Sequence, residues 1–413
     1  MDRSEHGTWW HVYPLGFTGA PIRTAHDAQP RLARLTAWLD YAVELGVGGL
    51  LLGPVFSSET HGYDSVDQYR IDPRLGDLAD FDALVAGCHE RGLRVVLDGV
   101  FNHVGAGHPW VRRALAEGPD GEYARFFRID WSDPLAPRTA DFEGHASLVA
   151  LDHDSPAVAD YVTDVMTTWL DRGADGWRLD AAYAVPPRFW AQVLPRVRAA
   201  HPDAWVLGEV IHGDYAAFAA ASGIESITQY ELWKAIWSSL ADRNFFELDW
   251  ALTRHLQLAE GQLPATFVGN HDVTRIATTV GAEGAVLALV VLMTVSGVPT
   301  VYYGDEQAFT GTKEERLGGD DAVRPAMPDS PAELPPGGAW MFRVHQQLLA
   351  LRRSHPWLVD AVTTTTGLTN TRYAYTARAR TGPGALHVEL DVTDGHHAVV
   401  RNAAGATLFA YDA

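Results

Sequence analysis

Eight short apolar runs, separated by loops and amphipathic stretches, constrain the fold of this 413-residue chain more than any other feature. Apolar runs that alternate with helical patterns are typical of parallel strands covered by helices. Eight such strands that close on themselves form a (β/α)8 barrel, the TIM-barrel architecture, so the sequence predicts an α/β fold of this class. The expected strands are Trp9–Tyr13, Gly49–Leu52, Arg94–Leu97, Gly176–Leu179, Trp205–Leu207, Ser226–Gln229, Ala265–Val268 and Thr300–Tyr303.

Two helices between these strands carry recognisable end signals. The stretch Arg31–Leu45 is expected to form one helix that ends at Gly46, since glycine is favoured just past a helix C-terminus. A second helix is expected over Ala157–Arg172, with Ser155 as N-cap and Pro156 in the first turn.

Two segments do not follow the alternation of strand and helix patterns. The stretch after the third strand is long and rich in Gly, Pro, Asp and aromatic residues, which predicts a short inserted subdomain. Near the C-terminus, Arg372–Arg378 and Ala385–Thr393 alternate as strands do, which predicts a small β module. The predicted division is 1–103 and 149–356 for the catalytic barrel, 104–148 for the inserted subdomain and 357–413 for the C-terminal β domain.

Charge and composition limit the partners of the chain. A formal net charge of −20 argues against nucleic acid and anionic membranes, because both attract a basic surface. The single cysteine, Cys88, rules out an intrachain disulfide. The N-terminus shows no signal-peptide pattern, and the longest apolar run, Ala285–Val298, is shorter than the roughly 20 residues of a membrane span. We therefore expect a cytoplasmic protein with no nucleic-acid or membrane partner, and the oligomeric state stays open.

Four carboxylates stand where predicted barrel strands end: Asp98, Asp180, Glu209 and Asp272. The C-terminal ends of barrel strands are where TIM-barrel enzymes hold their catalytic groups. A lone Asp at a strand end is more often a helix N-cap, but four carboxylates at four ends favour a shared chemical site.

Two of these carboxyl groups differ in their sequence neighbours. Arg178 lies two residues before Asp180, so both side chains share one face of the strand, and Arg178 is expected to keep Asp180 ionised with a lowered pKa. Glu209 has only apolar neighbours and is expected to hold a proton. Cleavage of an acetal needs one such acid and one such anion, and a third anion, Asp272, would stabilise positive charge on the sugar ring.

The segments around these carboxylates resemble the α-amylase family of glycoside hydrolases. The motifs are DGVFNHV, GWRLDAAY, LGEV and FVGNHD, supported by HGYDSVDQYRIDPRLGD and GVPTVYYGDE. The resemblance implies retention of configuration through a covalent glycosyl-enzyme intermediate, with Asp180 as nucleophile, Glu209 as acid/base and Asp272 as transition-state stabiliser. It also implies that the sugar at the cleaved position is surrounded by Tyr63, Asp98, His103, Arg178 and His271, with Tyr63 stacked on the ring and both His donating to its hydroxyls.

Within that family, the chain looks most similar to intracellular enzymes that degrade maltodextrins and cyclodextrins. Ala181, directly after the expected nucleophile, resembles α-1,4-acting members rather than α-1,6-acting ones, where Val is usual. Tyr183 and Ala184 replace the Lys-His pair of many secreted α-amylases. Asp320 and Arg324 resemble a pair that binds the non-reducing end of the substrate, and a solvated charged loop is the alternative.

The resemblance implies an oligosaccharide substrate, and three functions stay open. The first is hydrolysis of α-1,4-glucosidic bonds in short maltodextrins or cyclodextrins. The second is transglycosylation or isomerisation by the same carboxylate triad, as in trehalose-forming or sucrose-acting relatives. The third is a non-catalytic sugar-binding protein, which the presence of all three carboxylates disfavours.

No cofactor is expected. Asn102 matches a position that ligates calcium in many α-amylases, so a structural calcium ion is the alternative. Calcium takes about six to eight oxygen ligands, and the inserted segment offers few carboxylates beyond Asp130, Asp133 and Asp141. We therefore predict no metal site.

Overall fold

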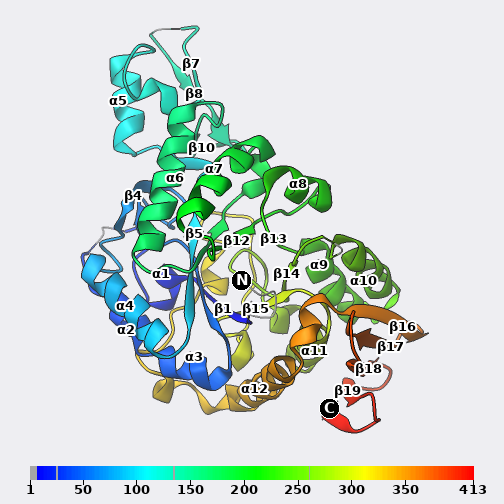
Figure 1. The fold of residues 1–413 in the computed structure, drawn as a ribbon. Helices are drawn as coiled ribbons and strands as arrows, with labels where there is room; N and C mark the ends of the chain where they lie inside the picture. Colours follow the sequence, from blue (N-terminus) through cyan, green and yellow to red (C-terminus); the bar gives the residue numbers. More distant parts are fainter. Residues whose placement is uncertain (1–6, 25–26, 134, 260) are drawn as a thin grey trace.

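The computed structural model describes residues 7–24, 27–133, 135–259 and 261–413, and its centre is a ring of eight parallel strands. Each strand pairs with the next along the chain, β15 pairs with β1, and a bridge between Thr228 and Ala265 joins β13 to β14. The sheet is therefore a closed barrel (Figure 1), and the predicted fold class is confirmed. The strands are β1 (Trp9–Val12), β2 (Gly49–Leu52), β5 (Arg94–Gly99), β11 (Gly176–Leu179), β12 (Trp205–Gly208), β13 (Ser226–Ile227), β14 (Ala265–Phe267) and β15 (Val298–Tyr302).

The predicted strand positions agree with the structure except at their ends. One of these differences is at β15, which begins at Val298 although the sequence predicted a start at Thr300. Pro299 lies inside this strand, opposite Thr266 of β14. Proline has no backbone N–H to donate to a neighbouring strand, so a proline in a sequence predicts a strand boundary.

Helices form the outer layer around the barrel (Figure 1). Large side chains fill the space between helices and strands, and Trp10, Trp169, Trp177 and Trp190 are fully buried there. The helices are α1 (Pro14–Phe17), α2 (Leu32–Thr36), α3 (Leu39–Leu45), α4 (Leu78–Glu90), α6 (Pro156–Asp171), α7 (Pro187–Ala200), α8 (Tyr215–Ser222), α9 (Tyr230–Ala241), α10 (Phe246–Leu258), α11 (Ile276–Thr294) and α12 (Ala339–Ser354).

The prediction of one helix over Arg31–Leu45 is wrong, because the chain forms α2 and α3 instead. The break lies at Trp38, which leaves helical geometry with φ −99° and ψ 0°. Its indole is buried and donates to the Pro328 carbonyl at 3.3 Å. Burial of this side chain outweighs helix continuity. The predicted end is confirmed, since Gly46 has the left-handed φ of 100°.

Helix α6 begins where the sequence predicted, with Ser155 at the N-cap position and Pro156 as its first residue. Ser155 has the extended backbone of an N-cap, but its side chain makes no capping hydrogen bond. The fixed φ of Pro156 therefore marks this start more than the serine hydroxyl does.

The segment after β5 projects from the barrel in the upper part of Figure 1. It contains α5 (Pro109–Glu117) and a three-stranded antiparallel sheet in the order β6-β10-β9. A two-stranded sheet pairs β7 with β8, and another pairs β3 with β4 before α4.

The predicted bounds of the inserted subdomain and of the other domains stay a prediction. The small strands are β3 (Phe56–Ser58), β4 (Ser65–Ile71), β6 (His103–Gly105), β7 (Ile129–Asp130), β8 (Arg138–Thr139), β9 (Asp141–Phe142) and β10 (His145–Ala150).

The C-terminal strands form one five-stranded antiparallel sheet beside α10 and α11. The Thr294 hydroxyl of α11 and the Tyr375 hydroxyl of the sheet lie 2.6 Å apart and join this sheet to the barrel layer. A small C-terminal β module is therefore confirmed. Its strands are β16 (Val362–Leu368), β17 (Arg372–Arg378), β18 (Ala385–Asp391), β19 (His397–Asn402) and β20 (Thr407–Asp412).

Helix α11 is more apolar than the others, with 19 residues and a mean hydropathy of 2.0 in its most apolar window. Within the described ranges it is the one helix that is long and apolar enough to cross a membrane. The backbone kinks at Gly281, and 67% of the apolar window is buried inside the protein. Packing in the barrel wall accounts for this composition.

Candidate active site

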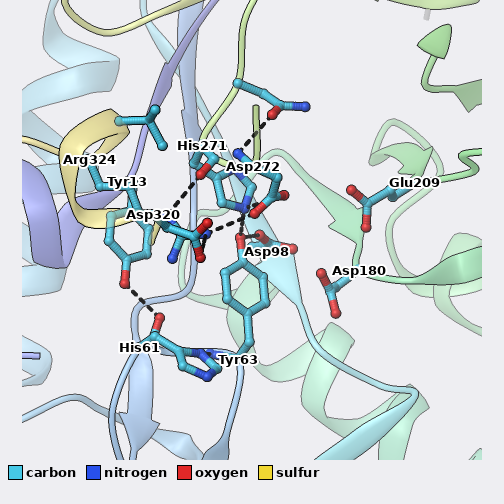
Figure 2. Close-up of polar contacts among 12 residues, drawn as sticks. Tyr13, His61, Tyr63, Asp98, Asp180, Glu209, His271, Asp272, Asp320 and Arg324 are labelled. Carbon is cyan, nitrogen blue, oxygen red and sulfur yellow. Dashed lines mark hydrogen bonds and ion pairs between the residues drawn. The ribbon is translucent and has the colours of Figure 1, made fainter. Parts of the chain in front are cut away.

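Four carboxylates lie at one rim of the barrel. Asp98 is close to the end of β5, and Asp180 and Glu209 directly follow β11 and β12. Asp272 lies farther along, in the turn between β14 and α11, so the expectation that it ends the strand is wrong. Figure 2 shows these four side chains gathered around Tyr63.

Asp180 and Glu209 occupy matching positions on neighbouring strands. Leu179, the last residue of β11, pairs with Gly208, the last residue of β12. The Glu209 amide then donates to the Leu179 carbonyl at 2.9 Å, which continues the pairing beyond the strand ends. Neighbouring strands lie about 4.8 Å apart. The two carboxyl groups therefore rise from adjacent points of the rim.

One buried guanidinium holds three of the carboxylates. Arg178 Nη1 lies 2.7 Å from both carboxylate oxygens of Asp98 and 3.3 Å from Oδ1 of Asp180. Its Nη2 lies 2.7 Å from Oε1 of Glu209. The strand register explains the first contact, since Arg178 stands opposite Asp98 on the neighbouring strand. The planar fork of arginine can serve several carboxylates at once.

The single Arg178 cation does not outweigh the burial of these carboxylates. Burial raises the pKa of Asp98 to about 6, against the lowering effect of Arg178. Burial also raises the pKa of Asp180 well above its usual range, and the Glu209 charge raises it further. The expectation that Arg178 gives Asp180 a lowered pKa is therefore wrong. The sequence showed the nearest cation but not the neighbouring anions or the depth of burial.

Glu209 has a polar environment, although its sequence neighbours are apolar. Besides Arg178, it accepts the Ala181 backbone N–H at 3.0 Å and the Tyr230 hydroxyl at 3.1 Å. The Tyr230 hydroxyl in turn accepts from the Asn270 amide at 2.9 Å. Sequence reasoning missed Tyr230, because it begins α9 and no motif marks it.

Ala181 has an uncommon backbone conformation for a residue with a side chain. Its φ of 44° and ψ of 37° are left-handed, and the residue is buried. This turn directs the Ala181 N–H at Glu209, one residue after Asp180. Left-handed geometry costs an alanine about 1–2 kcal/mol and a β-branched residue more. A small unbranched residue therefore fits this position.

We expect Ala181→Val to lower the free energy of unfolding by about 2 kcal/mol, because a branched side chain is disfavoured at this φ. Ala181→Gly is the matched variant and should stay within about 1 kcal/mol of the parent, since glycine adopts this backbone readily. Urea unfolding at neutral pH measures both. A Val variant as stable as the parent would contradict the strained turn.

Tyr63 and His271 form a stacked pair in the centre of the site. Their ring centroids lie 5.3 Å apart with an interplanar angle of 2°, and the Tyr63 hydroxyl contacts His271 Nε2. The same hydroxyl lies 3.1 Å from Asp98 Oδ2, and His271 Nε2 lies 3.0 Å from Asp272 Oδ2. Burial lowers the pKa of His271 well below its usual value, so the ring is neutral.

Both ring nitrogens of His103 have protein partners. Nε2 donates to the Tyr63 carbonyl at 3.0 Å, and Nδ1 lies 3.1 Å from the Asn102 amide. The ring stacks on Phe142 with centroids 4.8 Å apart, and burial lowers its pKa to about 4. His103 therefore joins Tyr63 to the inserted segment, and a bond to a sugar hydroxyl must replace one of these contacts.

Arg324 enters the site from the loop after β15. Its Nη2 donates to Asp272 Oδ1 at 2.8 Å and lies 3.2 Å from Asp320 Oδ2. Its Nε donates to the His271 carbonyl at 2.8 Å, and its guanidinium lies 4.9 Å from the centre of the Tyr13 ring. The alternative of a solvated loop is therefore wrong for Arg324, whose side chain is 9% exposed. Its binding role stays a prediction.

The residues considered for calcium make contacts within the protein. The carboxylates of Asp130, Asp133 and Asp141 each accept a backbone N–H of their own turn. The Asn102 amide is engaged with His103. Over the described parts of the chain, no group of three or more His, Cys, Asp or Glu side chains could hold a metal ion. Calcium needs several oxygens around one point, and the absence of a metal site stays a prediction.

The chain is similar to known proteins over most of its length. A family model described as the alpha amylase catalytic domain matches residues 12–333. The chain is 31% identical over 348 residues to neopullulanase 2 of Thermoactinomyces vulgaris, with 79% of this chain and 58% of that protein covered. It is 30% identical over 375 residues to a cyclomaltodextrinase of Geobacillus thermopakistaniensis, with 84% and 62% covered. The chain thus spans less than two thirds of either relative.

A solved structure with the same fold covers nearly the whole chain. The cyclic α-maltosyl-(1→6)-maltose hydrolase of Arthrobacter globiformis, in complex with maltose, has a TM-score of 0.83 and 25% identity. The match covers 98% of this chain and 99% of that one. The matched family model spans every strand of the barrel from β2 to β15 and all four rim carboxylates. The chain belongs to the α-amylase family of glycoside hydrolases.

Proposed function

We propose that this chain hydrolyses α-1,4-glucosidic bonds in short maltodextrins or cyclodextrins with retention of configuration. The observation that carries the proposal is the placement of Asp180 and Glu209 at matching positions of adjacent strands, both in contact with Arg178. Retaining glycosidases use two carboxyl groups about 5–5.5 Å apart. The backbones of Asp180 and Glu209 follow adjacent paired strands, which supports a spacing of this order.

In the proposed reaction, the Asp180 carboxylate attacks the anomeric carbon while Glu209 gives its proton to the leaving glycosidic oxygen. The bond from carbon to that oxygen breaks, and a bond to Asp180 forms. Glu209 then takes a proton from water, whose oxygen attacks the same carbon and releases Asp180. Asp272, held by Arg324 and His271, places a third negative charge beside the positive ring of the transition state.

The proposed reaction also requires that Glu209 carries a proton while Asp180 is ionised. In the free site the pKa of Asp180 is raised by burial and by Glu209. A sugar ring that develops positive charge beside Asp180 favours its ionised form, which leaves the proton for Glu209. Two carboxyl groups in unlike environments can thus act as nucleophile and acid.

The relatives named above support the proposed substrate class. They carry the names cyclomaltodextrinase, neopullulanase and cyclic α-maltosyl-(1→6)-maltose hydrolase. These names describe cleavage of α-glucans and cyclic maltosaccharides, so we place hydrolysis ahead of transglycosylation or isomerisation.

Incubation of the purified chain with maltotriose, β-cyclodextrin, pullulan and p-nitrophenyl α-glucoside tests the proposal. We expect glucose and maltose from maltotriose and linear products from cyclodextrin. Chromatography of products at high maltose concentration then compares water with sugar as the acceptor. The absence of product from all four substrates would contradict the proposal.

The activity of the chain should start to fall at an unusually high pH as the solution is made more acidic. Asp180 must be ionised to attack, and a raised pKa means that it gains a proton while the pH is still near neutral. We therefore expect kcat/KM to start falling at a pH well above the roughly 4 of an ordinary carboxyl group.

Asp98→Asn checks the cause of this shift, since the Asp98 charge raises the pKa of Asp180. Removal of that charge should move the acid limb of kcat/KM to lower pH. A parent limb near 4, or an upward shift in the variant, would contradict the assignment.

A further inference from the structure

A groove opens beside Glu209 and extends over helices α9 and α10. Its volume is about 550 Å³, and its lining includes Ile211, His212 and Gly213, which follow Glu209 on the same loop. Tyr230 also lines it, and the hydroxyl of this residue lies 3.1 Å from Glu209 Oε1. Tyr230 therefore joins the groove to the proposed acid.

The position of this acid defines which part of a substrate the groove faces. Glu209 donates its proton to the leaving oxygen, so the leaving sugar must lie on the Glu209 side of the broken bond. Asp320 and Arg324 lie on the other side of Tyr63 in Figure 2. The two ends of the substrate therefore leave the site in different directions, and the groove serves the leaving group.

Two tryptophans give the groove flat apolar surfaces. Trp250 of α10 is 64% exposed, and Trp233 of α9 is partly exposed. Trp233 also lines a second cavity of about 420 Å³ that reaches Asp272. Trp233 therefore lies between the groove and the cavity that Asp272 lines. A large exposed aromatic surface at the edge of a cavity is typical of a binding site.

The charged residues of the groove are balanced in sign. Arg254 pairs with Glu231, and Lys234 pairs with Glu247. These four side chains are partly exposed and offer donors and acceptors without a net charge. The chain as a whole has a formal charge of −20. A neutral ligand with many hydroxyl groups matches this local balance better than an ion does.

We propose that this groove binds the leaving-group end of an α-glucan, two or more glucose units beyond the cleaved bond, with Trp233 and Trp250 as stacking surfaces. The inference rests on the proposed hydrolysis, since Glu209 defines the direction of the leaving group. Chains of several glucose units reach Trp250, whereas an aryl glucoside ends next to Glu209.

The test compares Trp250→Ala with the matched control Phe246→Ala. Phe246 lies one turn earlier on α10, is 51% exposed and does not line the groove. The quantity measured is kcat/KM on maltoheptaose divided by kcat/KM on p-nitrophenyl α-glucoside. We expect this ratio to fall about tenfold in the Trp250 variant, since it loses a large aromatic contact. The Phe246 variant should keep the parent ratio. An unchanged ratio in Trp250→Ala would overturn the proposal.

A binding measurement separates this inference from the proposed function. If the parent chain cleaves neither substrate, hydrolysis is contradicted, and maltoheptaose is then titrated calorimetrically into the parent and both variants. Binding that weakens about tenfold in Trp250→Ala alone still supports a glucan groove. Equal affinity in all three proteins, or no binding to the parent, would overturn it.

Discussion

Asp180→Asn should lower kcat on maltotriose by about 10⁴-fold or more, because the amide cannot attack the anomeric carbon. The fold should not weaken. Asp180 is a buried carboxyl group beside Glu209 and Asp98, and burial and those charges raise its pKa. A neutral amide of the same shape removes this repulsion, so the variant should melt at the same or a higher temperature than the parent.

Asp154→Asn is a matched control for this substitution. Asp154 is 67% exposed and pairs with Arg188 on the surface, so both activity and melting temperature should stay at parent values. Activity measured by reducing-sugar release and melting followed by circular dichroism give the two readouts. A fully active Asp180→Asn variant would remove Asp180 from the nucleophile role.

Arg178→Ala should lower the free energy of unfolding by about 3–5 kcal/mol, the usual cost of leaving a buried charge without its partner. The expectation follows from geometry, since one guanidinium contacts Asp98, Asp180 and Glu209, and the Arg178 side chain is 4% exposed. This is a large share of the roughly 5–15 kcal/mol that stabilises a typical protein. Urea unfolding at pH 7 measures the loss.

Two further variants keep this prediction testable if Arg178→Ala does not fold. Arg178→Lys keeps the positive charge but loses the planar fork, so it should fold with a smaller loss. Arg188→Ala removes a cation that is 69% exposed and should change stability by less than about 1 kcal/mol. Parent-like stability of both Arg178 variants would show that the buried carboxylates need no cation.

The barrel and its rim carboxylates could be predicted because local patterns define them. Apolar runs give the strands, and a closed parallel sheet brings all their C-terminal ends to one rim. Asp98, Asp180 and Glu209 are each within a residue of a strand end, so topology alone brings them together. Their catalytic roles stay a prediction from the family resemblance.

The environment of each carboxyl group could not be predicted from neighbours in sequence. Glu209 lies between apolar residues in the chain, yet it contacts Arg178 from one strand and Tyr230 from a helix. The sign of the Asp180 pKa shift depends on burial and on Glu209 as well as on Arg178. The pKa of each carboxyl group thus depends on the packing of elements that are distant in sequence.

The sequence did not predict the helix break at Trp38, for a related reason. The local pattern favours one helix, but the indole is buried against the loop around Pro328, far along the chain. Tertiary packing outweighed helix propensity there. Trp250 also carries no local signal, since only the fold shows that it borders a groove.

Covalent trapping tests the central claim most directly. The chain is incubated with 5-fluoro-α-glucosyl fluoride, which reacts with a nucleophile but turns over slowly, and the labelled peptide is located by mass spectrometry. The account predicts one added fluoroglucosyl group, carried by Asp180 and absent in Asp180→Asn. A label on Glu209, Asp272 or any other side chain, or hydrolysis with inversion and no label, would contradict it.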